Sequence, residues 1–465
     1  MARPDNWVPL NKRDHINLLW IAAICLNQLT CNFIWTPIGA LTNPYCKKLG
    51  LNNVATTFVQ LIGSFVGISV PPFVAVWSDT TTLKIGRRRP WIIGGEVLVL
   101  AGLMMISFCR EMAGHKNGPA IAIFVIGQIL ASLGGNTANG PGRSMCSDVV
   151  PASQQVLVSN IVSFYNAVAG VISNLIGALK LYQYTSFNNE TLVLMVSCII
   201  GGVSFLISVC ATPEEPLLEK PETTNPVTLI IQSFKDLTRQ TFYLNLGCFF
   251  YCLGSTMFNW QNANFIASKV FHGDPLAPEG SGPYKTYDDG ISHSQLLALI
   301  QTVVQVAYST VNTPIVNFLG LRKAWTVGMA FGTLGNVVFF FTTNKWFYLL
   351  GYISLGVAQV VANSCPFAMI SIITPPEKLA GALTNIYFFN NVGALVCQFG
   401  LSMGLGSIQW FIDNPGRIIG LSFVFCVCGL VCGLFGYAPN SKPIDENEEI
   451  SDDEENSDSE RPNSL

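Results

Sequence analysis

Charged residues are scarce in this sequence. Asp, Glu, Lys and Arg together make up 11% of its 465 residues, whereas 50% are hydrophobic. Soluble domains carry about a quarter charged residues. The composition therefore indicates a membrane protein and disfavours a water-soluble globular one.

Side chains that could serve in catalysis or bind a metal ion are also few. The chain has four histidines, and its 14 cysteines form no CxxC pair and have no histidine at ligand spacing. No nucleophile or paired-carboxylate constellation is evident either. We therefore expect neither an enzyme nor a metal site or cofactor, and nothing in the sequence indicates nucleic-acid binding. No cleavable signal peptide is expected, because the first apolar stretch is too long for one.

Long apolar segments, by contrast, recur along the chain. About 20 apolar residues cross a bilayer, and the first six such segments lie at 16–40, 54–78, 91–109, 119–142, 157–180 and 191–211. The next six lie at 242–268, 295–318, 325–342, 346–373, 381–406 and 416–438. We expect an all-α membrane protein with twelve transmembrane helices in two pseudo-symmetric six-helix bundles.

This pattern divides the chain into five parts. The expected parts are a cytosolic N-terminus (1–15), a first bundle (16–211), a cytosolic linker (212–241), a second bundle (242–438) and an acidic, disordered cytosolic tail (439–465). Both termini are placed inside because most of the 25 lysines and arginines then fall in inner segments, as the positive-inside tendency requires. Asn189 begins an Asn-Glu-Thr sequon in a predicted outer loop and is a glycosylation candidate.

The two halves share a repeated sequence pattern. Ala138-Asn139 and Pro151 recur with the same spacing as Ala362-Asn363 and Pro375. Such parallel repeats are typical of transporters whose two bundles rock around a site at the middle of the membrane.

A basic loop joins the second and third predicted spans. A carboxylate and an arginine cluster at the ends of two helices can pair with the opposite half in one conformation and release it in another. This favours a gating role over a purely topological one, in which the arginines only mark the inner side. The proposed gating residues are Asp79, Gly86, Arg87, Arg88 and Arg89.

Glu96 is the one carboxylate that falls clearly within a predicted span. Because charge is costly inside a bilayer, such residues usually face a cavity and serve function. Glu96 is therefore a candidate for carrying a transported proton. The alternative is a neutral side chain, or one paired with an inner arginine such as Arg143.

Amides and aromatic rings within the spans could bind a polyhydroxylated solute, because amides both donate and accept hydrogen bonds. The alternative role for any single amide is a hydrogen bond between helices. The substrate-binding candidates are Asn32, Trp35, Asn136, Asn139, Arg143, Asn166, Trp260, Asn262, Asn264, Gln305, Asn363 and Asn391.

Several strings resemble a known family. GRRRP (86–90) follows Ser78-Asp79, NTANGPGR (136–143) precedes Asp148, and Thr36-Pro37 lies near the outer end of the first span. These resemble plant sucrose transporters, in the glycoside-pentoside-hexuronide branch of the major facilitator superfamily. The resemblance implies the major facilitator fold and a sugar–proton symporter, whose partners would be a sugar, protons and the lipid bilayer of the plasma membrane or of an endomembrane such as a vacuole.

The sequence also departs from that family. Ser132 stands where the resemblance implies the proton-carrying aspartate, and Asn264 falls in a seventh-span motif that is acidic in sucrose transporters. The leading hypothesis is a disaccharide–proton symporter that works by alternating access. The alternatives are a uniporter of a sugar or another neutral polar solute, and a non-transporting sensor with the same fold.

Overall fold

The regular structure in the described chain is helical. The computed structural model describes residues 10–151, 154–214, 225–278, 280–341, 344–374, 376–402, 408–413 and 416–435, and each regular element within these ranges is a helix. The long helices of the first half are α1 (Leu18–Lys48), α2 (Asn53–Asp79), α3 (Arg89–Ser107), α5 (Asn117–Val149), α6 (Gln155–Ala178) and α7 (Asn189–Ala211). Those of the second half are α9 (Arg239–Phe265), α10 (Gly282–Leu319), α11 (Leu321–Phe341), α12 (Tyr348–Ile373), α13 (Pro376–Val396) and α15 (Gly416–Phe435).

Short helical elements lie at the ends of these helices and between them. They are η1 (Leu10–Lys12), α4 (Cys109–Met112), η3 (Leu181–Tyr184), α8 (Pro226–Lys235), the π-helical segments η4 (Ile266–Val270) and η5 (Cys397–Ser402), and α14 (Gln409–Asp413).

Local signals in the sequence set several helix ends. The Asn52 side chain accepts a hydrogen bond from the backbone N–H of Ala55 and so caps the start of α2. Thr238 and Thr241 form a capping box at the start of α9. Gly320 has a φ of 80°, which side chains rarely adopt, and it separates α10 from α11.

A helix of at least 19 residues lies on each of the twelve segments predicted to span the membrane. By length and composition, seven described helices are apolar enough to cross a membrane: α1, α2, α3, α5, α7, α12 and α15. The prediction of an all-α membrane protein is confirmed, while the full count of twelve spans stays a prediction. Over their described residues, the other five long helices, α6, α9, α10, α11 and α13, do not meet this measure.

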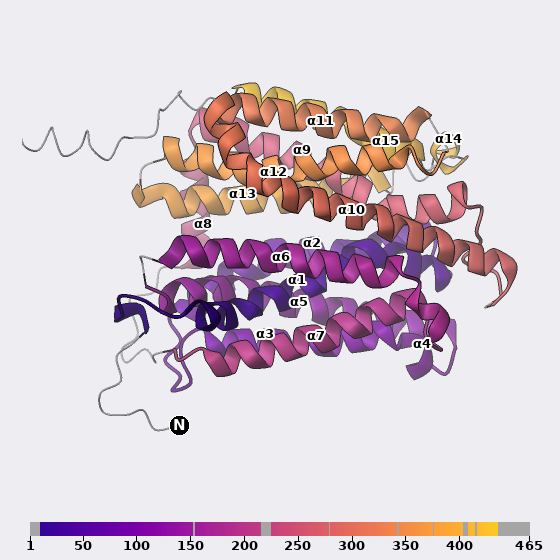
Figure 1. Cartoon of the computed structure of the whole chain (residues 1–465), viewed down its shortest axis with the longest axis horizontal. Helices are drawn as coiled ribbons and strands as arrows, with labels where there is room; N and C mark the ends of the chain where they lie inside the picture. Colours follow the sequence, from indigo (N-terminus) through magenta and orange to yellow (C-terminus); the bar gives the residue numbers. More distant parts are fainter. Residues whose placement is uncertain are drawn as a thin grey trace, which may run out of the picture.

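The long helices form two bundles with the same internal neighbours. In the first bundle α1 packs against α6 and α7, and α5 packs against α2 and α3. In the second, α9 packs against α13 and α15, and α12 packs against α10 and α11. Figure 1 shows the first bundle below and the second above. The same pairs therefore recur, as expected for a duplicated six-helix unit.

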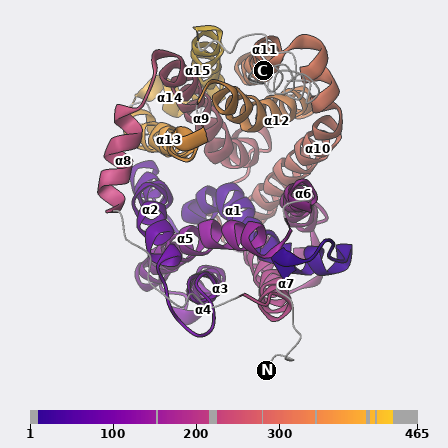
Figure 2. The same cartoon turned by 90° about the vertical axis from the view of Figure 1, so that its left-hand side faces the viewer.

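The bundles meet through α1 and α9, α2 and α13, and α6 and α10. Helix α8 contacts both α2 and α13, and Figure 2 shows it alongside these helices at one end of the molecule. The predicted boundaries at residues 16, 211, 242 and 438 stay predictions. The proposed N-terminus (1–15) and tail (439–465) lie largely or wholly outside the described residues.

Glycines bring α3 and α5 into close contact. A Cβ atom added at Gly95 would lie 2.7 Å from the backbone oxygen of Gly134 and 2.8 Å from the backbone nitrogen of Ala138. One added at Gly102 would lie 2.6 Å from the backbone oxygen of Gly127. Small residues at such crossings let helices approach within a membrane, where packing drives their association.

Gly94 and Gly95 provide a matched test of this contact. We expect Gly95→Ala to lower the free energy of unfolding by about 1–3 kcal/mol, because the new methyl group must separate two backbones. Gly94→Ala should be neutral or stabilising by up to about 1 kcal/mol, since a Cβ at Gly94 meets nothing within 4 Å. Thermal unfolding of the purified variants in detergent measures both. Equal midpoints for the two variants would contradict the packing described here.

Candidate functional site

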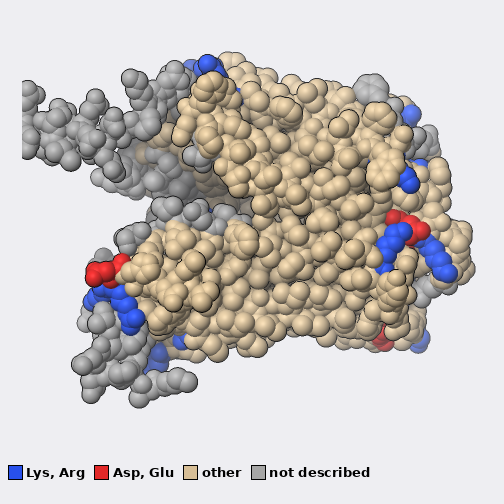
Figure 3. All heavy atoms as spheres, viewed as in Figure 1, with Lys and Arg blue, Asp and Glu red and all other residues tan. Residues whose placement is uncertain are grey.

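A cavity of about 850 Å³ lies between the two halves. Its walls come from α1, α2 and α5 of the first half, from the linking helix α8, and from α13 and η5 of the second half. Figure 3 shows the molecule hollowed between its halves at the end where α8 lies in Figure 1. Small-molecule sites usually measure about 300–1,000 Å³, so the cavity is large enough for such a ligand.

Amides and aromatic rings supply much of the cavity wall. The amides are Gln60, Gln128, Asn136, Asn139, Asn385, Asn391 and Gln398, and the aromatic residues are Trp35, Phe234, Tyr387 and Phe388. Amides donate and accept hydrogen bonds, and aromatic rings offer flat apolar faces. The wall is therefore able to bind a solute that carries several hydroxyl groups.

Five of the predicted substrate-binding residues line this cavity: Trp35, Asn136, Asn139, Arg143 and Asn391. They come from α1, α5 and α13, so the fold brings together residues more than 350 positions apart in the sequence. Asn391 also joins the halves, because its Nδ2 donates to the backbone oxygen of Gly67 on α2 at 3.5 Å.

Other predicted residues form hydrogen bonds between helices, which is the alternative role considered above. Asn32 Nδ2 donates to Asn166 Oδ1 and joins α1 to α6. The Tyr287 hydroxyl donates to Asn264 Oδ1 at 2.9 Å, between α10 and α9.

The remaining predicted residues also lie away from the cavity lining. Gln305 Nε2 donates to Gln359 Oε1 at 2.8 Å, between α10 and α12. Asn262 is buried and Asn363 is exposed, and neither contributes to the cavity wall. The side chain of Trp260 lies outside the described residues.

Sequence reasoning missed part of the lining. Gln60 and Ser64 lie one turn apart on α2, and Gln128 precedes Asn136 by about two turns on α5. These residues could have been predicted, because polar side chains at helical spacing within an apolar span mark one face of the helix. Phe234 could not have been predicted in this way. It lies in the linker helix α8, outside the predicted spans, and only the folded arrangement places it at the cavity.

Arg143 supplies the positive charge of the cavity wall. Its side chain is exposed, and none of the residues that line the cavity within the described chain is acidic. A guanidinium group carries five N–H donors and no acceptor. Arg143 can therefore donate hydrogen bonds to the oxygen atoms of a ligand.

Glu96 is buried inside the first half, away from the cavity lining. Its side chain is fully buried, and its Oε1 accepts a hydrogen bond from the Cys31 thiol at 3.5 Å. Its Oε2 has no hydrogen-bond partner among the described residues. The alternative pairing with Arg143 is not present, since Arg143 lies in the cavity wall and Glu96 does not.

Ser132, where the resemblance places the family's aspartate, is also fully buried. Its hydroxyl has no hydrogen-bond partner among the described residues. Its backbone oxygen accepts from Asn136 Nδ2 at 2.9 Å, one turn further along α5.

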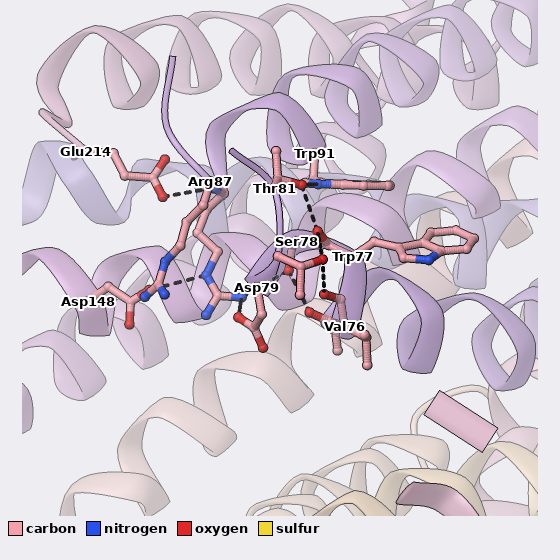
Figure 4. Close-up of polar contacts among 12 residues, drawn as sticks. Val76, Trp77, Ser78, Asp79, Thr81, Arg87, Trp91, Asp148 and Glu214 are labelled. Carbon is pink, nitrogen blue, oxygen red and sulfur yellow. Dashed lines mark hydrogen bonds and ion pairs between the residues drawn. The ribbon is translucent and has the colours of Figure 1, made fainter. Parts of the chain in front are cut away.

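The predicted gating loop carries a network of ion pairs, drawn in Figure 4. Arg88 Nη1 lies 2.5 Å from Asp79 Oδ1, and Arg88 Nε lies 3.2 Å from Asp148 Oδ2. Arg87 Nη2 contacts the same Asp148 oxygen at 2.6 Å. Arg88 also donates to the Ser78 hydroxyl. These contacts join α2, α3 and α5, so in this conformation the ion pairs lie within the first half.

Glu214 completes this network and was not predicted from the sequence. It follows α7, and its carboxylate accepts from the backbone N–H of Arg88 at 2.8 Å and of Arg89 at 3.0 Å. A carboxylate at the start of α3 is stabilised by the helix dipole. Gly86 is required beside it, because its φ is 122° and an added Cβ would lie 2.2 Å from Glu214 Oε2. Arg89 Nη2 donates to the backbone oxygen of Val209 on α7.

Asn189, the glycosylation candidate, is a contact between the halves in this conformation. Asn189 is fully buried at the start of α7, and its Nδ2 donates to the Ser292 hydroxyl of α10 at 3.3 Å. Because a glycan would be attached to that same nitrogen, it has no room in this arrangement. The glycosylation of Asn189 stays a prediction.

Comparison with known sequences finds plant transporters. The chain is 22% identical over 468 residues to sucrose transport protein SUT1 of Oryza sativa subsp. japonica, an alignment that covers 86% of this chain and 84% of the rice protein. It is 23% identical to sucrose transport protein SUC4 of Arabidopsis thaliana, with 87% and 86% of the two chains covered.

Comparison with solved structures finds transporters of the same architecture. A D-xylose-proton symporter matches with a TM-score of 0.64 and 15% identity over 90% of this chain and 97% of its own. A POT family transporter in complex with 5-aminolevulinic acid matches with a TM-score of 0.67 and 13% identity over 92% and 98%. The model of the Major Facilitator Superfamily matches residues 23–275. With its two six-helix bundles and the cavity between them, this chain belongs to the Major Facilitator Superfamily.

Proposed function

We propose that this protein carries a sugar, a disaccharide such as sucrose or a similar glycoside, across a membrane by alternating access and together with a proton. The proposal rests chiefly on the cavity of about 850 Å³ between the halves, whose wall includes several amides and aromatic rings. Sugars are bound through many hydrogen bonds to hydroxyl groups and through contact of their apolar faces with aromatic rings.

The relatives support the same substrate class. Proteins aligned over most of this chain are named sucrose transport proteins in rice and Arabidopsis. The comparisons do not favour the alternatives of an uncoupled carrier or a non-transporting sensor. Within the proposal, Trp35 offers a ring to a sugar face, while Asn136, Asn139 and Asn391 bond its hydroxyl groups. Arg143 donates to its oxygen atoms.

The proton is assigned to Glu96 in this proposal. Ser132 cannot take up a proton in the way that a carboxylate does, so a different group would carry it. Glu96 is the carboxylate buried within α3, and one of its oxygens is not engaged by a described donor. Such intramembrane carboxylates usually mark proton pathways.

The loop from Asp79 to Arg89 is assigned to the inner gate. Its ion pairs now hold the ends of α2, α3 and α5 together, while the cavity is open beside α8. When the halves close at this end, the same charged side chains would lie at the interface between them. The two partners of one of these ion pairs differ in exposure: the Arg88 side chain is 10% exposed and the Asp79 side chain is 52% exposed.

Uptake by liposomes tests the proposed function. We expect purified protein to accumulate labelled sucrose or maltose when an inward proton gradient is imposed, and to equilibrate the sugar without one. Empty liposomes are the control. Equilibration alone under a gradient would refute proton coupling, and the absence of uptake for both sugars would refute the proposed substrate class.

Glu96→Gln tests the proton assignment. The amide cannot take up a proton, so we expect gradient-driven accumulation to fall to simple equilibration while sugar exchange continues. Glu111→Gln is the matched control, since Glu111 is an exposed carboxylate on α4. Accumulation by Glu96→Gln at the level of the control would remove Glu96 from the role.

Arg88→Ala tests the gate against a topological role of the loop. We expect turnover to slow about tenfold, or ~1.4 kcal/mol, with sugar affinity changed by no more than about twofold, because Arg88 bridges two carboxylates away from the cavity lining. Asp79→Asn should act in the same direction. Lys84→Ala removes the same charge from an exposed position of the same loop and should leave turnover unchanged. Loss of sugar binding in Arg88→Ala, or equal slowing in Lys84→Ala, would contradict the gate.

A further inference from the structure

Polar contacts between the halves gather at the end of the molecule opposite the cavity mouth. They involve the ends of α1, α6 and α9 and the starts of α7 and α10. The contacting pairs are Lys48 with Asp288, Lys180 with Asp289, Asn43 with Gln261, and Asn189 with Ser292. The outer end is therefore joined across the halves, whereas the ion pairs at the inner end lie within one half.

Lys48 stands at the centre of a buried ion triad. Its Nζ lies 2.8 Å from Glu190 Oε2 and 2.5 Å from Asp288 Oδ1. The side chains of Lys48 and Glu190 are fully buried, and that of Asp288 is 6% exposed. The rings of Tyr284 and Tyr287 cover the ammonium group, with Nζ 4.8 and 5.8 Å from their centroids.

The three residues are divided unequally between the halves. Lys48 on α1 and Glu190 on α7 belong to the first half, whereas Asp288 on α10 belongs to the second. An isolated buried ion pair resists separation, because separation leaves each charge without its partner. Here Lys48 would keep Glu190 as a partner if Asp288 moved away with the second half. The triad can therefore open without leaving an unpaired lysine in the first half.

We propose that Lys48, Glu190 and Asp288 form the outer gate of this transporter. Asp288 is the part of the gate that releases, and Glu190 is the part that holds Lys48 while the gate is open. The closed triad stabilises the conformation in which the cavity opens beside α8. This inference rests on the alternating access proposed above, but it concerns the conformational equilibrium and not the substrate.

The chain supplies a matched control one residue away. Lys180, at the end of α6, pairs with Asp289 and joins the same two halves at the same end. Both of these side chains are 39% exposed. Exposed ion pairs contribute little, because water and salt screen them. The outer gate is thus predicted to depend on Asp288 and not on Asp289.

The thiol of a Ser292→Cys variant can report opening of the outer end. Ser292 is 1% exposed, lies one turn from Asp288 on α10, contacts Asn189 of the other half and does not line the cavity. The background carries Cys210→Ser, because Cys210 is the exposed native cysteine. The rate of maleimide labelling at position 292 is measured on purified protein in detergent, with peptide mass spectrometry to identify the labelled thiol.

The two carboxylates of the triad should act in opposite directions. Asp288→Asn should raise the labelling rate about tenfold, which corresponds to ~1.4 kcal/mol in the opening equilibrium. Glu190→Gln should lower the labelling rate. In this variant Asp288 is the one carboxylate of the triad that remains, so opening would leave Lys48 without a carboxylate partner in the triad. Asp289→Asn should change the rate by less than about twofold.

Several results would overturn the outer gate. They are an unchanged rate in Asp288→Asn, an equal increase in Asp289→Asn, or an increase in both Asp288→Asn and Glu190→Gln, which would indicate a static structural role. If Asp288→Asn does not fold, slower labelling in Glu190→Gln supports the gate, and faster or unchanged labelling refutes it. Because labelling requires no sugar, a failure of sugar uptake would refute the proposed function without changing this result.

Discussion

The bilayer interior offers no water to a polar group, and this constraint shapes the whole molecule. Every backbone group must be bonded within its own segment, so the chain crosses as helices. Polar side chains must likewise turn away from lipid toward a partner or a cavity. The amides that line the cavity and those that bridge helices, such as Asn32 with Asn166 and Gln305 with Gln359, are two outcomes of the same requirement.

Ion pairs serve different purposes at the two ends of the molecule. At the end where α8 lies, Arg87, Arg88 and Asp148 bind α3 to α5 within the first half, and the molecule is hollowed between its halves. At the opposite end, Lys48 and Asp288 bind the first half to the second. This asymmetry gives a cavity that is open at one end and closed at the other, which is one of the states that alternating access requires.

Features that depend on the local sequence pattern could be predicted from the sequence. Apolar length located the long helices, and the charged loop after Asp79 was recognised because its residues are adjacent in the chain. Contacts between distant positions could not be predicted in this way. Glu214 contacts Arg88 and Arg89, which lie 126 and 125 positions away in the sequence. Lys48 contacts Asp288, which lies 240 positions away. The burial of Asn189 could not be predicted for the same reason, because its contact partner Ser292 lies 103 positions away on α10.

Hydrogen–deuterium exchange with and without sucrose tests whether sugar binding between the halves shifts which end of the protein is open. We expect sucrose to lower exchange in segments at the end where α8 lies, such as 79–89 and 139–150, and to raise it in segments at the opposite end, such as 43–52 and 282–292. Opposite changes at the two ends would establish the exchange of access. Unchanged exchange at both ends, or protection at both, would contradict it.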